Sequence, residues 1–343
     1  MKSYPFVSIL LPVRNEEKYI KSCLQSLLSQ DYPLGKIEIL IADGLSTDNT
    51  RSVINELKLD HSHISLFDNP GRIVPVGLNI LIREAKGEVI IRVDGHTTIS
   101  SDYIRQCVQA LDSYGAQNVG GRMNPVGSNL FGEAVAAATS TPFGIGGGRF
   151  HFSEKQEWVD TVYLGAWPKT VFEEIGLFDE ELVRDQDDEF NYRLRASGGK
   201  ILLTPKVKSF YTVRSSPKAL WKQYFEYGFW KVRVLQKHPR QMSLRQFVPL
   251  AFVVALIMTF LLSLMFPWGW KALLALLAVY LLANLSASIM TASGQGFKKL
   301  ILLPLAFAII HLSYGLGFLG GLFKFWNRWQ DKKGRVPPLN WQT

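Results

Sequence analysis

The sequence predicts an α/β domain built on a mostly parallel sheet and followed by C-terminal transmembrane helices. Strand-like and helix-like segments alternate through the N-terminal half of the chain, which is the pattern of βαβ units. Beyond residue 246, three stretches contain no Asp, Glu, Lys or Arg: 247–266, 272–297 and 300–323. Each reaches the length of about 20 apolar residues that is needed to cross a bilayer core.

The predicted strands are short runs rich in Val, Ile and Leu that end in polar residues. Runs of this kind indicate strands that are covered on both faces. In an open α/β sheet, ligands bind at the carboxyl ends of such strands. In chain order, strands are expected at 7–13, 37–44, 64–69 and 88–95, with a late edge strand at 201–205.

The predicted helices have apolar residues at helical spacing and lie mostly between these strands. The first carries Ile20, Leu24 and Leu27 on one face, and the second opens with possible caps at Ser46 and Thr47. In chain order, helices are expected at 15–30, 46–60, 77–87, 101–115, 170–182 and 186–200.

The basic surplus of the chain lies in one segment, 206–246. Residues 206–245 contain ten Lys or Arg and one acid, a surplus of nine, and the formal net charge of the whole chain is also +9. Aromatic residues interleave with these charges just before the first apolar stretch. Basic residues beside a span attract anionic lipids, and aromatic residues settle at the interface. A lipid surface or a phosphorylated lipid substrate therefore fits better than nucleic acid, which can produce a similar local pattern.

The cysteines and the N-terminal residues predict where the first part of the chain resides. Cys23 and Cys107 are the two cysteines; they fit a reducing compartment and indicate neither a disulfide framework nor a zinc site. The first residues, MKSYPFVSILLP, lack the apolar core and cleavage site of a signal peptide. We therefore expect a multi-pass protein of a bacterial-type inner (plasma) membrane with its first 200 residues in the cytoplasm. A basic tail also prefers the cytoplasm, which leaves both two and three crossings open.

Three acidic positions lie at the ends of predicted elements. Asp43 ends the second strand, Asp94 ends the fourth, and residues 185–189 hold four carboxylates. Asp94 and His96 can converge on one cation, because a carboxylate oxygen and an imidazole nitrogen both suit Mn²⁺; an Asx-capped turn is the simpler interpretation. The acidic cluster can be a solvated helix face, but such crowding is costly unless a cation or a substrate offsets the repulsion.

His311 lies inside the last apolar stretch, where an ionisable residue is by default a hypothesis of function. Because Ser313 and Tyr314 are nearby, the favoured interpretation is a hydrogen bond to a neighbouring helix.

Four segments together resemble one enzyme family. In chain order they read VSILLPVRNEEKYI, IEILIADGLSTDNT, VDGH and GLFDEELVRDQDDEFNYRLR. This ordered set resembles the inverting GT-A glycosyltransferases of family 2 over residues 6–235. The block DQDDEFNYRLR, with YGFWKVRVLQKHP, resembles the succinoglycan-biosynthesis type glucosyltransferases. The resemblance implies a GT-A domain, that is, a nucleotide-diphospho-sugar transferase with a Rossmann-like mixed sheet.

The resemblance also implies a role for each acidic position. Asp43 matches the carboxylate that accepts a hydrogen bond from the nucleobase, and Asp94 with His96 matches the Asp-x-Asp that holds a metal on the diphosphate. Asp187 matches the aspartate that acts as general base, and Asp188 is the rival for that role. The other implied contacts with the nucleotide sugar are Pro12, Arg14, Asn15, Glu16, Gly77 and Asn79.

Two departures from the family pattern affect the chemistry. His96 replaces the second aspartate, and the missing negative charge favours Mn²⁺, which tolerates imidazole, over Mg²⁺. Gln186 replaces the glutamate before the base, and a helix that points Asp187 inward turns Asp188 about 100° away. We therefore expect Mn²⁺ or Mg²⁺ as the cofactor and Asp187 as the base.

These expectations give a domain plan and a function. The plan has a catalytic domain at 1–205, an interfacial segment at 206–246, a membrane domain of two or three helices at 247–325 and a basic tail at 326–343. The expected reaction moves a sugar from a UDP-sugar, with UDP-glucose favoured by the resemblance, to a polyprenyl-diphosphate-linked saccharide in exopolysaccharide biosynthesis. The alternatives are a polyprenyl-phosphate sugar synthase, which needs no hydroxyl base, and a non-catalytic membrane scaffold of a polysaccharide export complex.

Overall fold

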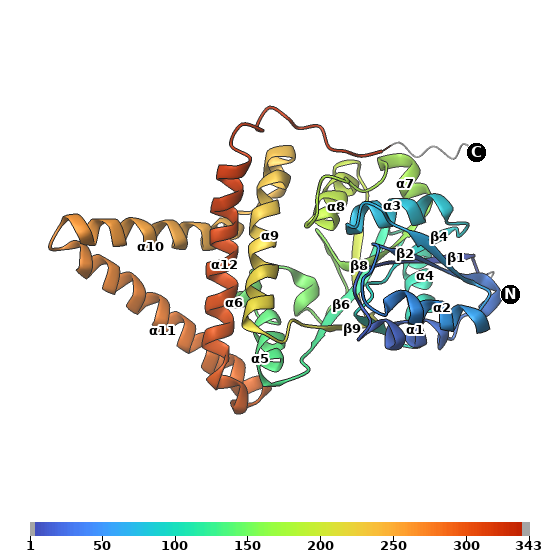
Figure 1. Cartoon of the computed structure of the whole chain (residues 1–343), viewed down its shortest axis with the longest axis horizontal. Helices are drawn as coiled ribbons and strands as arrows, with labels where there is room; N and C mark the ends of the chain where they lie inside the picture. The colour runs from blue at the N-terminus through green and yellow to red at the C-terminus, as the bar shows by residue number, and fades with distance from the viewer. Residues whose placement is uncertain (1–3, 338–343) are drawn as a thin grey trace. The chain divides into compact units, whose positions relative to one another are not determined.

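A computed structural model describes residues 4–337 of the chain (Figure 1), so residues 338–343 of the expected basic tail lie outside the described residues. The chain forms two compact units. The first comprises Met1–Asn124, Arg149–Tyr211 and Gly334–Thr343, and the second comprises Pro125–Gly148 and Thr212–Lys333.

The first unit is organised around a mixed sheet, in which the described residues form nine strands. The main path has the order β3-β2-β1-β4-β8-β6-β9-β5, and β7 pairs with β9. Strands β3, β2, β1 and β4 are parallel, whereas β8 runs antiparallel to β4. The bounds are β1 Val7–Val13, β2 Ile37–Asp43, β3 Ile64–Asp68, β4 Val89–Arg92, β5 Thr97–Ile99, β6 Asn118–Val126, β7 Glu157–Val159, β8 Tyr163–Pro168 and β9 Ile201–Thr212.

Helices cover both faces of this sheet, and Figure 1 shows α1 and α2 on one side with α3 and α7 on the other. In β1, Ile9 packs in the hydrophobic core with residues of α1, α2 and α4, while Leu10 packs with residues of α3, α7 and α8. Successive strand residues point to opposite faces, so a continuous apolar run serves two cores. The bounds are α1 Ile20–Leu28, α2 Thr50–Asp60, α3 Val74–Glu84, α4 Tyr103–Tyr114, α7 Thr170–Ile175 and α8 Gln186–Ala196. The predicted α/β class is confirmed.

Strand β9 differs from the expected short edge strand. It continues to Thr212 and lies between β6 and β5. From Lys206 onward its residues alternate between exposed and buried, so Lys206 and Lys208 occupy the outer face of a strand. The expected domain boundary at residue 205 therefore falls inside β9. The two lysines Lys206 and Lys208, which had suggested an interfacial segment, belong to the sheet.

The second unit consists of helices, including three that are long and apolar enough to cross a membrane: Leu244–Met265, Gly269–Gln295 and Leu303–Lys324. On α10 and α11, Leu264, Leu282 and Met290 expose 69%, 67% and 75% of their surface, and apolar surface of this kind marks a membrane or partner contact. The bounds are α5 Leu130–Thr139, α6 Pro142–Ile145, α9 Pro217–Lys237, α10 Val248–Met265, α11 Gly269–Gln295 and α12 Leu303–Lys324.

Helices α9 and α12 pack along each other through glycines. A Cβ on Gly228 of α9 would come closer than 3.0 Å to the backbone of Tyr314, and one on Gly317 of α12 would do the same at Phe225. Small residues allow two helix backbones to approach this closely. The same unit includes residues 125–148, because α5 packs against α12 and α11; the domain plan had placed them in the catalytic domain.

Hydrogen bonds within the second unit explain the half-buried His311 and the buried Arg233. His311 bonds through Nε2 to the carbonyl of Phe143 at 2.7 Å and through Nδ1 to the hydroxyl of Tyr280 at 3.1 Å, which confirms its interpretation as a contact between helices. Arg233 is fully buried, and its guanidinium contacts Gln236 and the backbone of Asp331. Part of the basic surplus is therefore directed into protein rather than toward lipid.

Candidate active site

The loops after β1 and β2 interlock at the carboxyl edge of the sheet. Asn15 has a left-handed backbone (φ 55°), its N–H donates to Ser46 Oγ at 2.9 Å, and its Oδ1 accepts from the N–H of Thr47 at 2.9 Å. Next to it, the N–H of Glu16 donates to Thr50 Oγ1 at 2.7 Å. The expected nucleotide-contacting residues of the first loop are thereby held by the second loop.

Two further residues of this expected set flank the interlocked loops. Pro12 is buried in β1 opposite Ala42 of β2. Arg14 is exposed, and a Cβ on Gly44 would meet its side chain at 3.1 Å. A glycine after β2 thus gives the Arg14 side chain room at the edge of the sheet.

Asp43 is the last residue of β2 and is fully buried. Its carboxylate accepts from Ser46 Oγ at 2.5 Å and from Arg51 at 3.0 Å. A hydrogen bond to Asp68, and a weaker one to Asp43, raise the pKa of Arg51 against the opposing effect of its desolvation. The N–H of Ser46 also donates to Asp43 Oδ2 at 3.1 Å, so these contacts occupy most of the about four lone-pair positions of the carboxylate. Its contact with the nucleobase stays a prediction.

Asp94 lies just beyond β4 and pairs with Arg92. Arg92 Nε donates to Asp94 Oδ1 at 2.8 Å and Nη2 donates to Oδ2 at 3.3 Å, with exposed side-chain fractions of 8% and 16%. Burial alone would lower the pKa of Arg92, but the charges of Asp94 and Asp187 outweigh it and raise that pKa. Arg92 is therefore paired with Asp94 and also lies within the electrostatic influence of Asp187.

His96 is oriented by Glu16. The distance between His96 Nδ1 and Glu16 Oε1 is 2.9 Å, and the His96 ring also meets Tyr211 edge-on with ring centroids 5.2 Å apart. If Nδ1 carries the proton of that hydrogen bond, Nε2 keeps its lone pair, which is the arrangement found for histidines that bind metals. The resemblance assigned Glu16 and His96 to the nucleotide-sugar site, but the sequence did not show that their side chains form a hydrogen bond.

The donor set fits a divalent cation that is held jointly with a ligand. Among the described residues, no cluster of three or more His, Cys, Asp or Glu could hold a metal ion. Asp94 and His96 offer one carboxylate and one imidazole nitrogen, which suit Mn²⁺. Oxygen atoms from a bound diphosphate would be needed to complete the coordination.

The acidic cluster begins helix α8. Its N-cap, Asp185, has a left-handed backbone (φ 61°), and Asp187 and Asp188 lie in the first turn. Carboxylates are stabilised there by the helix dipole. Glu189 is buried and pairs with Arg193 at 2.7 Å, so this member of the cluster has a structural partner within its own helix.

Asp187 and Asp188 act electrostatically on different neighbours. The charge of Asp187 raises the pKa of Arg92, as described above. Burial lowers the pKa of His151, in the short helix Arg149–His151, to about 3, and the charge of Asp188 partly opposes that shift. The charge of Asp187 thus acts on Arg92, the residue that pairs with Asp94.

Asn79 is fully buried in α3, and its amide holds a distant loop. Nδ2 donates to the carbonyl of Phe178 at 2.9 Å and to Glu180 Oε1 at 3.0 Å, while Oδ1 accepts from the N–H of Phe178 at 2.9 Å. Gly77, two residues earlier, leaves room for Asn69, whose Nδ2 would lie 2.9 Å from a Cβ there. The contact of Asn79 with a nucleotide stays a prediction.

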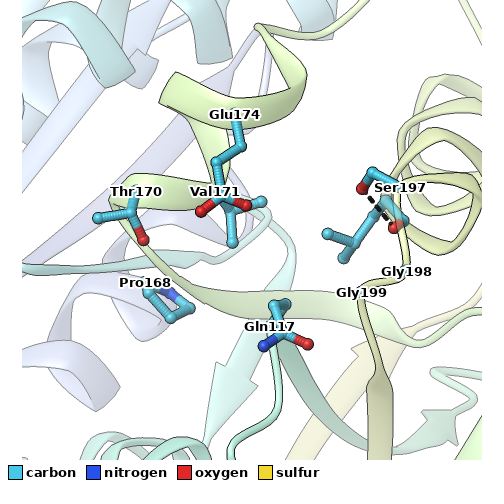
Figure 2. Close-up of a pocket in the computed structure, with 9 residues that line it drawn as sticks. Gln117, Pro168, Thr170, Val171, Glu174, Ser197, Gly198 and Gly199 are labelled. Carbon is cyan, nitrogen blue, oxygen red and sulfur yellow. Dashed lines mark hydrogen bonds between the residues drawn. The ribbon is translucent and has the colours of Figure 1, made fainter.

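A cavity of about 230 Å³ lies away from these residues (Figure 2), with Gln117, Thr170 and Glu174 among its lining side chains. It is also lined by Pro168, which pairs with Val89 at the start of β4. The cavity is therefore at the amino ends of the parallel strands, opposite to the acidic positions, and we assign it no part in the candidate site.

A mixed sheet of this order, with acidic side chains after β2 and β4 and at the start of α8, defines a GT-A type domain. Residues 8–160 match the family model Glycosyl transferase family 2. The chain is 31% identical over 327 residues to the dolichyl N-acetyl-alpha-D-glucosaminyl phosphate 3-beta-D-2,3-diacetamido-2,3-dideoxy-beta-D-glucuronosyltransferase of Methanococcus voltae, which covers 93% of this chain and 98% of that protein. The chain is also 30% identical to succinoglycan biosynthesis protein ExoA of Rhizobium meliloti, and the alignment covers 93% of this chain and 96% of that protein. The chain belongs to glycosyltransferase family 2 and is a glycosyltransferase.

Solved structures confirm the GT-A fold. The mannosyltransferase PcManGT from Pyrobaculum calidifontis, in complex with GDP-Man and Mn2+, is similar with a TM-score of 0.59 and 19% identity, covering 93% of this chain and 88% of that one. S. aureus TarS 1-349 in complex with UDP-GlcNAc gives a TM-score of 0.51 and 17% identity, covering 97% and 96%. At these identities the likeness establishes the fold of the chain alone.

Proposed function

We propose that the chain is a membrane-associated inverting glycosyltransferase that transfers a sugar from a UDP-sugar to a lipid-linked saccharide. The observation that carries this proposal is the coupling of Asp94 and Asp187 through Arg92. The proposal assigns Asp94 to the diphosphate and Asp187 to the role of base. Arg92 pairs with Asp94, and the charges of both carboxylates raise its pKa, which supports a common site.

The names of the two similar proteins support the choice of substrates. One acts on a dolichyl N-acetyl-glucosaminyl phosphate, which is a lipid-linked sugar, and the other takes part in succinoglycan biosynthesis. We infer a polyprenyl-diphosphate-linked saccharide as acceptor, with UDP-glucose as the favoured donor. The exposed apolar surfaces of α10 and α11 support an acceptor that enters from a membrane. We further propose that the catalytic domain lies on the cytoplasmic side.

The proposed mechanism assigns a task to each group. Asp94 and His96 would hold Mn²⁺ or Mg²⁺ against the diphosphate, and a cation there supplies charge neutralisation for the leaving group. Glu16 fixes the His96 ring. Asp187 accepts the proton of the acceptor hydroxyl as its oxygen attacks the anomeric carbon, and general-base catalysis of this type contributes about 10²- to 10⁴-fold. A single displacement inverts that carbon, so an α-linked donor gives a β-linked product.

The proposal can be tested with membranes that contain the full chain. Labelled UDP-glucose and other UDP-sugars are added, the lipid fraction is extracted, and the reaction is repeated with a chelator. We expect label in lipid that is lost with the chelator and restored by Mn²⁺. No label in lipid from any UDP-sugar would overturn the proposal, and transfer that survives Asp187→Asn would favour a polyprenyl-phosphate sugar synthase. Asp188→Asn is the matched control and should retain transfer.

A further inference from the structure

The chain returns to the catalytic unit after its last long helix. Residues from Gly334 onward belong to the first unit, and the described C-terminal residues run beside α7 (Figure 1). The N–H of Glu180 donates to the carbonyl of Arg335 at 2.9 Å, and the N–H of Arg335 donates to Asp179 Oδ1 at 2.9 Å. This reciprocal pair joins residues that are 156 positions apart in the sequence.

The contact between residues 334–336 and residues 176–181 is closely packed. Asp179 is fully buried, and its Oδ1 also accepts from the N–H of Glu181 at 3.0 Å. A Cβ on Gly334 would come closer than 3.0 Å to the Asp179 carboxylate. A Cβ on Gly176, whose φ is +79°, would meet the Val336 side chain at 3.2 Å. Glycine is therefore required where the tail crosses Asp179.

The loop that receives the tail leads directly to the proposed base. On its other sides, Asn79 holds both backbone groups of Phe178, and Arg193 of α8 donates to the carbonyl of Leu177 at 2.8 Å. A few residues later the left-handed Asp185 starts α8, with Asp187 in its first turn. Loop 176–181 therefore lies a few residues before the start of α8 and is bonded to that helix through Arg193.

We propose that residues 334–336 form a positioning strap, which holds loop 176–181 and through it fixes Asp187 against the acceptor. The proposal rests on the function proposed above for Asp187. The strap contacts loop 176–181 and not the loops after β1 and β2, so its loss should lower the rate of transfer more than the affinity for the nucleotide. A misplacement of about 1 Å at a catalytic group can reduce the rate about 100-fold.

Two full-length variants test the strap. Gly334→Val places a side chain against Asp179, and Arg335→Pro removes the N–H that bonds its carboxylate. Gly35→Val is the matched control, because a Cβ at Gly35 meets nothing within 4 Å. Purified proteins are compared for transfer rate, for UDP affinity by calorimetry, and for hydrogen–deuterium exchange in residues 176–190.

We expect kcat to fall about 10- to 100-fold in both strap variants, with unchanged UDP affinity, faster exchange in 176–190, and no change in the control. Wild-type kcat in both variants would overturn the proposal, as would losses of kcat and UDP affinity in equal proportion, which indicate general destabilisation. If the wild type transfers no sugar, the function proposed above fails. Exchange then still tests the strap, and unaltered exchange in the variants would refute it separately.

Discussion

Replacing Asn79 by Leu should destabilise the catalytic unit strongly, because the side chain is of similar size but cannot form hydrogen bonds. The wild-type amide satisfies both the N–H and the carbonyl of Phe178, a residue that is 1% exposed. Each buried backbone group that loses its partner costs about 1–3 kcal/mol, so two of them cost about 2–6 kcal/mol. For a domain of this size, 1 kcal/mol corresponds to about 2–4 °C in Tm, and a central value of ~4 kcal/mol gives a decrease of about 8–16 °C.

Thermal unfolding of the detergent-solubilised chain, followed with and without UDP, measures this effect. Asn79→Asp serves as a second variant: it keeps the acceptor for the Phe178 N–H but brings a buried carboxylate against the Phe178 carbonyl and Glu180, so its Tm should also fall below that of the wild type. A wild-type Tm for Asn79→Leu together with lost UDP affinity would refute the reasoning. That result would show that Asn79 acts mainly on the nucleotide.

Three further predictions follow from the described contacts. Glu16→Ala should weaken Mn²⁺ binding in the presence of UDP about 10- to 100-fold, measured by electron paramagnetic resonance, because the His96 ring loses its orienting carboxylate; unchanged affinity would contradict this role. The folded His151 takes up its proton only near its lowered pKa of about 3, whereas the unfolded chain does so near 6.5, so acidification between these values destabilises the fold by up to about 1.4 kcal/mol per pH unit. The Tm of His151→Phe should therefore fall less than that of the wild type between pH 7 and pH 5, and an equal fall in both proteins would contradict this prediction. Gly317→Leu should cost about 1–3 kcal/mol by forcing α12 from the backbone of α9, and a Tm equal to that of Gly294→Leu, where a Cβ meets nothing, would count against close packing.

Local patterns were sufficient to predict the four parallel strands and their acidic edge, but not strands β5 to β8, whose antiparallel pairing makes the expected mostly parallel sheet a mixed one. Apolar runs in β1 and β2 predicted strands with two covered faces, and Ile9 and Leu10 do pack into opposite cores. Parallel strands end at one edge, which is why Asp43 and Asp94 could be assigned to that edge from the sequence.

Contacts between residues distant in the sequence could not be predicted in the same way. The Asn79 amide meets Phe178, and the Arg335 backbone meets Asp179, but no local periodicity encodes either pairing. The Arg92–Asp94 pair left a weak signal, since residues two apart on a strand share a face. The alternation along β9 was also present, although Lys206 had been attributed to a lipid interface.

The most direct test of the account separates catalysis from binding at Asp187. Sugar transfer to extracted lipid and UDP affinity are measured on the same preparation of Asp187→Asn, with wild type and Asp188→Asn beside it. The account predicts that transfer falls by about 10²-fold or more in Asp187→Asn alone, while UDP affinity stays within about twofold of wild type. Loss of UDP affinity in Asp187→Asn, or loss of transfer in Asp188→Asn with Asp187→Asn active, would contradict it.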